Sequence, residues 1–242
     1  MGQYYNPQVV VNNLIVNYDM ANFISYSGSG NTINNLIQSS FGATVGGYIS
    51  NSPPVYSSNN KGYLTFSSAT GSSCFGTFPH FGSTLSTFTL EAWYYLTALP
   101  AANTVQALIT QQFTGGGKIN FSLGFNGARG SGAADGKING GFYDTTWQLT
   151  DGFTPSINTW YQSVVTYDGT TIIQYTNGAQ IGSTAPTAPS LGTGTNFNYL
   201  MRRWDDPNFI DGRLAIARIY NRALTANEVL KNYLANKGRF GL

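Results

Sequence analysis

The distribution of apolar and polar positions along the chain predicts many short strands separated by turns. Apolar and β-branched residues recur in short runs, and clusters of Gly, Asn, Ser and Pro end each run. Runs of this kind at close spacing are typical of an antiparallel sandwich or barrel. The clearest predicted strands are Val9–Val16, Tyr63–Phe66, Thr87–Leu96, Val105–Gln112, Lys118–Phe125, Lys137–Tyr143, Trp160–Tyr167, Thr171–Thr176 and Asn208–Tyr220.

The sharpest local pattern is a meander of three strands that begins at Tyr161. Two turn dipeptides, Asp168-Gly169 and Asn177-Gly178, separate its apolar runs. Both dipeptides provide the positive φ angles that a two-residue type I′ hairpin turn requires. We therefore predict two tight hairpins in succession.

One helix is marked near the end of the chain. Thr225 is placed to cap it, Glu228 completes a capping box three residues later, and Leu224 is spaced to pack on Val229 as a hydrophobic staple. Gly238 provides the stop. The apolar stripe that would face the body of the protein consists of Val229, Leu230, Tyr233 and Leu234.

The sequence contains no linker and no internal repeat, which indicates a single all-β domain. We expect a two-sheet antiparallel sandwich with one short C-terminal helix. The predicted division is an N-terminal arm at residues 1–12 and a domain at residues 13–242, with the helix at 226–236.

Composition supports a folded, strand-rich protein. Charged residues make up 9% of the chain, hydrophobic residues 41% and aromatic residues 14%, whereas disorder needs low hydrophobicity and high net charge. The net charge is only +2. Basic residues gather in 201–242, but the pI of about 8.6 is below that expected of a nucleic-acid-binding domain. We expect no nucleic-acid partner.

Cysteine usage and the N-terminal residues bear on location. Cys74 is the only cysteine, so no internal disulfide forms, and we expect it to fill core space. No basic residue precedes Lys61, so a signal peptide is not indicated, and no apolar run is long enough to span a membrane. We expect a protein made in the cytoplasm, with release only by lysis or within a particle.

Three stretches resemble motifs of the laminin-G-like, concanavalin A-like lectin/glucanase superfamily. They are Phe88–Trp93, the hairpin region Asn158–Gly178, and a closing strand and turn made of Phe209–Leu214 and Ala217–Leu224. Their order and spacing are those of the family over about residues 13–236. The resemblance implies a two-sheet antiparallel jelly roll.

Two further stretches resemble the branch of this family found in the virion proteins of tailed bacteriophages. They are Tyr18–Gly30 and the ending Glu228–Leu242. The resemblance implies a non-enzymatic structural protein on the outside of the virion, and a capsid decoration subunit is the leading hypothesis. Its partners would be the major capsid protein or tail proteins, and other copies of itself. The alternative is a receptor-binding tail adhesin that recognises a host surface glycan.

The residues give little support to catalysis. Glu91 and Glu228 are the only glutamates and fall in different elements, while Asp205 and Asp206 are adjacent and would point to opposite faces of a strand. Glycosidases need a pair of carboxylates facing one cleft. His80 is the only histidine, and no Gly-x-Ser-x-Gly elbow accompanies it. We predict that the protein is not an enzyme.

Calcium is the one metal to consider, because the resemblance implies a fold whose members often bind it. The candidate ligands are Asp19, Asp205, Asp206 and Asp211. However, Ala215-Ile216 replaces an acidic pair of the family, so we expect no required cofactor. Asp168 and Asp211 precede glycines and are better explained as turn residues.

Sugar binding needs exposed aromatic rings beside planar polar groups, and two clusters in the sequence meet this requirement. The alternative is that their tryptophans pack between the sheets. The predicted carbohydrate-binding residues are Tyr143, Asp144, Trp147, Trp204, Asp205, Asp206 and Asn208. In the N-terminal arm, the predicted capsid contacts are Tyr4, Tyr5 and Pro7.

Overall fold

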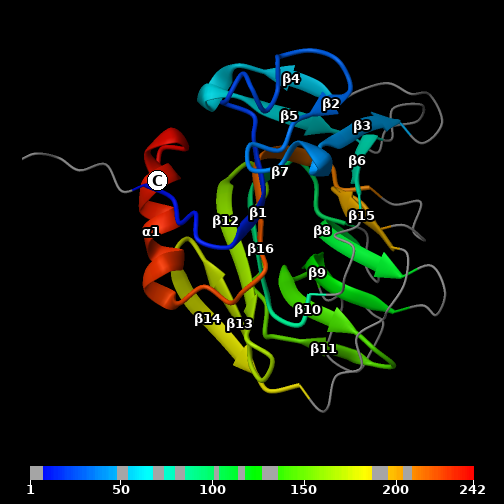
Figure 1. Ribbon diagram of the computed structural model, residues 1–242, viewed down its shortest axis with the longest axis vertical. Helices are drawn as coiled ribbons and strands as arrows, with labels where there is room; N and C mark the ends of the chain where they lie inside the picture. The colour runs from blue at the N-terminus through cyan, green and yellow to red at the C-terminus, as the bar shows by residue number, and fades with distance from the viewer. Residues whose placement is uncertain are drawn as a thin grey trace, which may run out of the picture.

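A computed structural model describes residues 8–47, 54–67, 74–79, 85–100, 104–113, 118–126, 136–186, 196–203 and 209–242. In these residues, two eight-stranded antiparallel sheets face each other in a sandwich, and one α-helix lies outside it (Figure 1). This is the predicted all-β architecture, and it is consistent with a concanavalin A-like jelly roll. In the described part of the chain, no helix is long and apolar enough to cross a membrane.

Sheet A contains all three strands of the predicted meander. Its order is β14 (Ala179–Thr184), β13 (Ile172–Thr176), β12 (Trp160–Tyr167), β7 (Phe88–Leu96), β16 (Gly212–Tyr220), β5 (Tyr63–Phe66) and β4 (Val55–Ser57), and β1 (Leu14–Asp19) pairs with β16.

Sheet B contains most of the strands that the pattern did not predict. Its order is β11 (Trp147–Leu149), β10 (Asn139–Tyr143), β9 (Ile119–Phe125), β8 (Gln106–Phe113), β15 (Asn196–Leu200), β6 (Cys74–Phe78), β3 (Ala43–Gly47) and β2 (Thr32–Ile33). β2, β3, β6, β11 and β15 are all five residues or shorter. Such short strands show too few alternations for a period-two signal.

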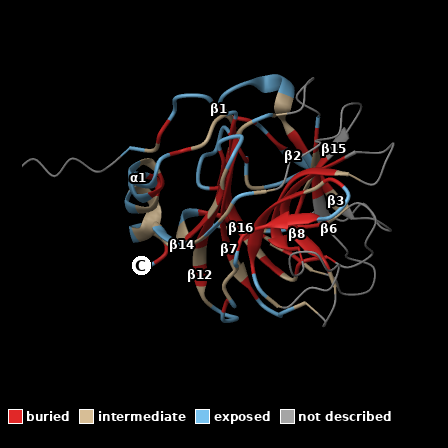
Figure 2. Cartoon of the chain, turned by 90° about the horizontal axis from the view of Figure 1, so that it is seen from below, coloured by how far each residue is buried: buried red, intermediate tan, exposed pale blue. Residues whose placement is uncertain are grey.

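The core lies between the sheets, where buried strands appear red in Figure 2. On β7, the alternate residues Phe88, Leu90, Ala92, Tyr94 and Leu96 belong to the main hydrophobic cluster. The positions between them, Thr89, Glu91, Trp93 and Tyr95, therefore point to the outer face of sheet A.

The two predicted hairpins have different outcomes. Asn177 and Gly178 have φ angles of 50° and 78° and connect Thr176 directly to its partner Ala179, as a two-residue type I′ turn requires. The prediction of a two-residue turn at Asp168-Gly169 is wrong, because Tyr167 pairs with Ile172 and a loop of four residues connects them.

The Asp168 side chain explains this longer loop. Its Oδ1 accepts hydrogen bonds from the backbone N–H groups of Thr170 (2.8 Å) and Thr171 (2.7 Å). These bonds lower the pKa of Asp168 against the opposing effect of burial. Because the carboxylate satisfies two loop amides, the longer loop is stable here.

The helix α1 (Ala226–Asn236) has the predicted capping box. Thr225 Oγ1 accepts from Glu228 N, and Glu228 Oε2 accepts from Thr225 N. The helix ends at Asn236, as predicted, but Gly238 does not provide the stop, because the chain continues from Asn236 into a 3₁₀ turn, η3 (Lys237–Arg239), that contains Gly238.

The predicted apolar stripe of α1 is only partly correct. Val229 is buried, but Leu230 and Leu234 are 41% and 39% exposed. Asn232 is fully buried instead. The helix is therefore rotated so that the polar side chain of Asn232 faces sheet A. Its hydrogen-bond partners lie on the outer face of that sheet.

Candidate functional site

The outer face of sheet A is built around Glu91, a fully buried carboxylate on β7. Glu91 Oε1 accepts hydrogen bonds from Trp93 Nε1 (3.0 Å), Gln162 Nε2 (2.9 Å) and Arg218 Nη1 (3.0 Å). Its Oε2 accepts from Asn232 Nδ2 at 2.8 Å. All four groups are hydrogen-bond donors, and one of them is the Arg218 guanidinium. The Glu91 carboxylate therefore has a structural role.

Asn232 extends this network to the N-terminal segment. Its Oδ1 accepts from Val10 N at 2.8 Å, and its Nδ2 also donates to Tyr220 Oη at 2.9 Å. Tyr220 in turn donates to Val10 O, and burial raises the pKa of this tyrosine. Burying Asn232 therefore satisfies polar groups on the sheet and on residue 10 at once, which explains the rotation of α1.

Glu228, the other glutamate, also has a structural role. Arg222 Nη1 and Nη2 donate to its two carboxylate oxygens at 2.8 and 2.7 Å. These hydrogen bonds, together with the capping box, lower the pKa of Glu228 to about 2. Neither glutamate is left available as an acid or base.

Beyond this network, the C-terminal segment packs on the outer face of sheet A at Trp93 of β7 and at Trp160 of β12. Phe240, which follows η3, stacks on Trp93 and contacts Trp160, with both ring centroids 4.6 Å away. Tyr233 of α1 stacks on Trp93 at 5.8 Å. The next outward position on β7, Tyr95, is only half-buried.

Tyr95 belongs to a row of residues that face each other across five strands of sheet A. We call it the Arg213 row; it consists of Val55, Thr65, Arg213, Tyr95 and Trp160. The Arg213 guanidinium lies 4.2 Å from the Tyr95 ring centroid and 4.8 Å from that of Tyr63. A half-buried aromatic ring thus lies beside a planar polar group on the outer face of sheet A, next to Trp160, which Phe240 contacts.

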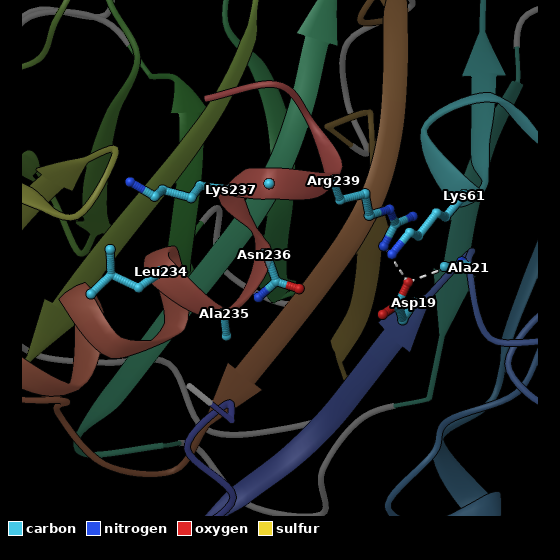
Figure 3. A pocket seen from close by; sticks show the side chains of 9 residues that line it. Asp19, Ala21, Lys61, Leu234, Ala235, Asn236, Lys237 and Arg239 are labelled. Atoms are coloured by element: carbon cyan, nitrogen blue, oxygen red, sulfur yellow. Dashed lines mark hydrogen bonds and ion pairs between the residues drawn. The ribbon is translucent and has the colours of Figure 1, made fainter. Parts of the chain in front are cut away.

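A polar pocket of about 400 Å³ lies where β1 ends and β5 begins, under the corner between α1 and η3 (Figure 3). An Asp19–Arg239 ion pair closes one side, with Asp19 Oδ1 2.6 Å from Arg239 Nη1 and 2.9 Å from Ala21 N. Arg239 also donates through Nε to Asn60 O and through Nη2 to Gly62 O. Burial lowers the pKa of Arg239, opposed by Asp19.

The carbonyls that Arg239 binds belong to a left-handed turn. Asn60, Lys61 and Gly62 have φ angles of 50°, 62° and 131°, although non-glycine residues avoid this region. A Cβ on Gly62 would lie 2.2 Å from the carbonyl oxygen of Met20, the residue that follows β1, so this close approach requires glycine. The turn presents Lys61 at the pocket.

The candidate calcium ligands are not brought together in the described residues. Asp19 pairs with Arg239, Asp211 O accepts from Thr97 N, and Asp205 and Asp206 lie outside the described residues. Within the part of the chain that the structure describes, no group of three His, Cys, Asp or Glu residues is placed to hold a metal.

Three of the predicted carbohydrate-binding residues, Tyr143, Asp144 and Trp147, lie on the other sheet, at the β10–β11 hairpin. Tyr143 is half-buried, and Asp144 Oδ1 accepts from Thr145 N (2.6 Å) and Thr146 N (3.1 Å), which shapes the turn. Trp147 is only 5% exposed; its ring lies 5.4 Å from that of Tyr143 and 6.0 Å from the Arg203 guanidinium.

Several predicted residues fall outside the described part of the chain. They are Tyr4, Tyr5, Pro7, His80, Trp204, Asp205, Asp206 and Asn208, together with the side chain of Cys74. The Arg213 row and the pocket were not predicted. Alternation on β7 places Tyr95 on the outer face, but the cross-strand register that joins it to Arg213 is not readable from sequence.

Solved structures share this fold at low sequence identity. Domain 4 of the extracellular arabinanase AbnA from Geobacillus stearothermophilus, in complex with arabinotriose, has a TM-score of 0.66 and 20% identity, over 92% of this chain and 98% of that one. The binding domain of Paraclostridial Mosquitocidal Protein 1 has a TM-score of 0.66 and 15% identity, over 92% of this chain and 52% of that one. Trypanosoma rangeli sialidase has a TM-score of 0.62 and 14% identity, over 96% and 34%.

The chain therefore spans about half of the toxin domain's length and a third of the sialidase's. A comparison with curated protein sequences finds no match. A family model, by contrast, matches residues 58–230. This match, with the two-sheet sandwich, shows that the chain belongs to the concanavalin A-like lectin/glucanases superfamily.

Proposed function

We propose that this protein is a non-enzymatic, lectin-like subunit that binds carbohydrate. The observation that carries the proposal is the Arg213 row, where the half-buried Tyr95 lies against the half-buried Arg213 guanidinium on the outer face of sheet A. A sugar presents apolar C–H faces, which suit an aromatic ring, and hydroxyl groups, which suit a guanidinium.

Two observations support this proposal. The arabinanase domain bound to arabinotriose shares the fold over 98% of its length, so the likeness extends to a whole binding domain. In addition, Glu91 and Glu228 are both engaged in structural hydrogen bonds, and a glycosidase needs two carboxylates facing the scissile bond. We expect no release of reducing sugar from bacterial glycans.

A glycan array followed by calorimetry on the best ligand tests carbohydrate binding. Tyr95→Ala and Arg213→Ala should each weaken binding about tenfold, whereas Lys231→Ala, on the exposed side of α1, should not. If the wild-type protein binds no glycan, the proposal is wrong.

The site predicted from sequence remains a second proposal for the same ligand class. It comprises Tyr143, Asp144 and Trp147 with Trp204, Asp205, Asp206 and Asn208. Tyr143→Ala is the variant to compare, because Trp147 is buried and its removal would disturb folding. If Tyr143→Ala loses glycan binding while Tyr95→Ala keeps it in full, the carbohydrate site lies at the β10–β11 hairpin and not at the Arg213 row.

We further propose that the protein decorates the outside of a tailed-phage capsid, with Tyr4, Tyr5 and Pro7 as contacts to the capsid. The support is the resemblance of Tyr18–Gly30 and Glu228–Leu242 to phage virion proteins. The copy number per virion tests this role: hundreds of copies indicate decoration, whereas a few to some tens indicate a tail adhesin. Deleting residues 2–8 should leave a folded protein that no longer assembles onto particles.

A further inference from the structure

The pocket of Figure 3 has an excess of positive charge. Its lining contains three basic side chains, Lys61, Lys237 and Arg239, and one acidic side chain, Asp19. Arg239 and Asp19 neutralise each other at 2.6 Å, and the Arg239 side chain is only 6% exposed. The charge available to a ligand therefore comes from the lysines.

Lys61 is the lysine placed to act in the pocket. Its side chain reaches toward the Asp19–Arg239 pair, whereas Lys237 points away in Figure 3 and lies 5.8 Å from the Tyr233 ring centroid. Lys61 is exposed and forms no ion pair within the described part of the chain. A compact ammonium group with three donors is thus left at the mouth of a polar cavity.

The backbone at Lys61 is a second, independent observation. Lys61 occupies the left-handed region at φ 62°, and Arg239 holds the carbonyls on both sides of it. A non-glycine residue in this conformation is disfavoured, and such outliers cluster at ligand clamps. Glycine at position 61 would adopt this left-handed conformation with less backbone strain than lysine, so the turn itself does not require a lysine.

From these observations we infer that this pocket binds the anionic group of an acidic sugar, with Lys61 as the residue that recognises the charge. The inference rests on the proposed carbohydrate binding and specifies an acidic sugar in the glycan. A cavity of about 400 Å³ has room for one sugar ring. The carboxylate of a uronic acid would lie against Lys61, with polar groups of Asn236 and the η3 turn near its hydroxyls.

The chain offers clean variants for a test. Lys61→Gly removes the charge and suits the left-handed backbone, so its melting temperature should equal or exceed that of the wild type. Gly238 lines the pocket, and a Cβ there would have no atom within 4 Å. Gly238→Glu therefore adds a negative charge to the pocket, and Gly238→Gln is its neutral control of the same size.

Titration with glucuronate and with methyl glucoside at low ionic strength, followed by NMR, measures the effect. We expect glucuronate to bind more tightly, and added salt to reduce the difference. Lys61→Gly should weaken glucuronate binding about fivefold, a typical effect for an exposed charge pair. Gly238→Glu should weaken it more than Gly238→Gln does.

Equal affinity for the two sugars, or unchanged glucuronate binding in Lys61→Gly and Gly238→Glu, would overturn the inference. Binding of inorganic phosphate without any binding of glucuronate would also overturn it, since the pocket would then hold only a simple anion. Tyr95→Ala separates this result from the proposed function, because neutral-glycan binding that depends on Tyr95 would survive failure at the pocket.

Discussion

Replacing Glu91 with glutamine should strongly destabilise the protein. The carboxylate is fully buried, and the groups that face it are donors from Trp93, Gln162, Arg218 and Asn232. A glutamine amide places its own N–H₂ donor among them and leaves the buried Arg218 without its anion.

Breaking a buried ion pair by removing one partner costs about 3–5 kcal/mol. For a chain of this length, a cost of that size lowers Tm by about 10 °C. It is also a large fraction of the roughly 5–15 kcal/mol by which domains are stable.

Urea denaturation measures this cost and includes a double-mutant cycle. Arg218→Met removes the cation, and the Glu91→Gln/Arg218→Met protein should be more stable than the sum of the single effects predicts, by about 2 kcal/mol. Glu228→Gln is the matched control on the other glutamate, and it should cost about 1 kcal/mol or less because that pair is partly exposed. A cost below about 1 kcal/mol for Glu91→Gln, or simple additivity in the cycle, would refute the reasoning.

Three further predictions follow from the same structure. Phe240→Ala removes a ring that stacks on Trp93 and packs against Trp160, so it should cost about 3 kcal/mol in urea denaturation and raise the exposure of tryptophan to a quencher. An unchanged denaturation midpoint would contradict this packing. Because folding lowers the pKa of Glu228 to about 2, the stabilisation from this carboxylate should be complete above pH 4.5 and fade as the pH falls toward 2. The melting temperatures of the wild type and Glu228→Gln should therefore converge at low pH, and a difference in Tm that stays constant with pH would contradict this prediction. Removing divalent cations with a chelator should leave Tm unchanged, because the Asp19 carboxylate is paired with Arg239. A fall in Tm of several degrees that added calcium reverses would show that the fold needs a metal.

The features that the sequence determined by itself depend on residues close together in the chain. The Asn177-Gly178 turn needs two neighbouring residues with positive φ, and the capping box of α1 needs Thr225 and Glu228 three positions apart. Alternation within β7 likewise separates core positions from outer ones. Each pattern lies within one turn or one element, so its physical cause is present in the sequence itself.

Where side chains have distant partners, only the tertiary structure decided the outcome. Asn232 binds Val10, 222 residues away, and Glu91, 141 residues away, which is why α1 buries an asparagine and leaves Leu230 exposed. Arg239 likewise binds the turn at Asn60 and Gly62, which helps to form the pocket. Burying a polar group is favourable only when its partners converge on it, and convergence depends on strand register and helix docking that no local pattern encodes.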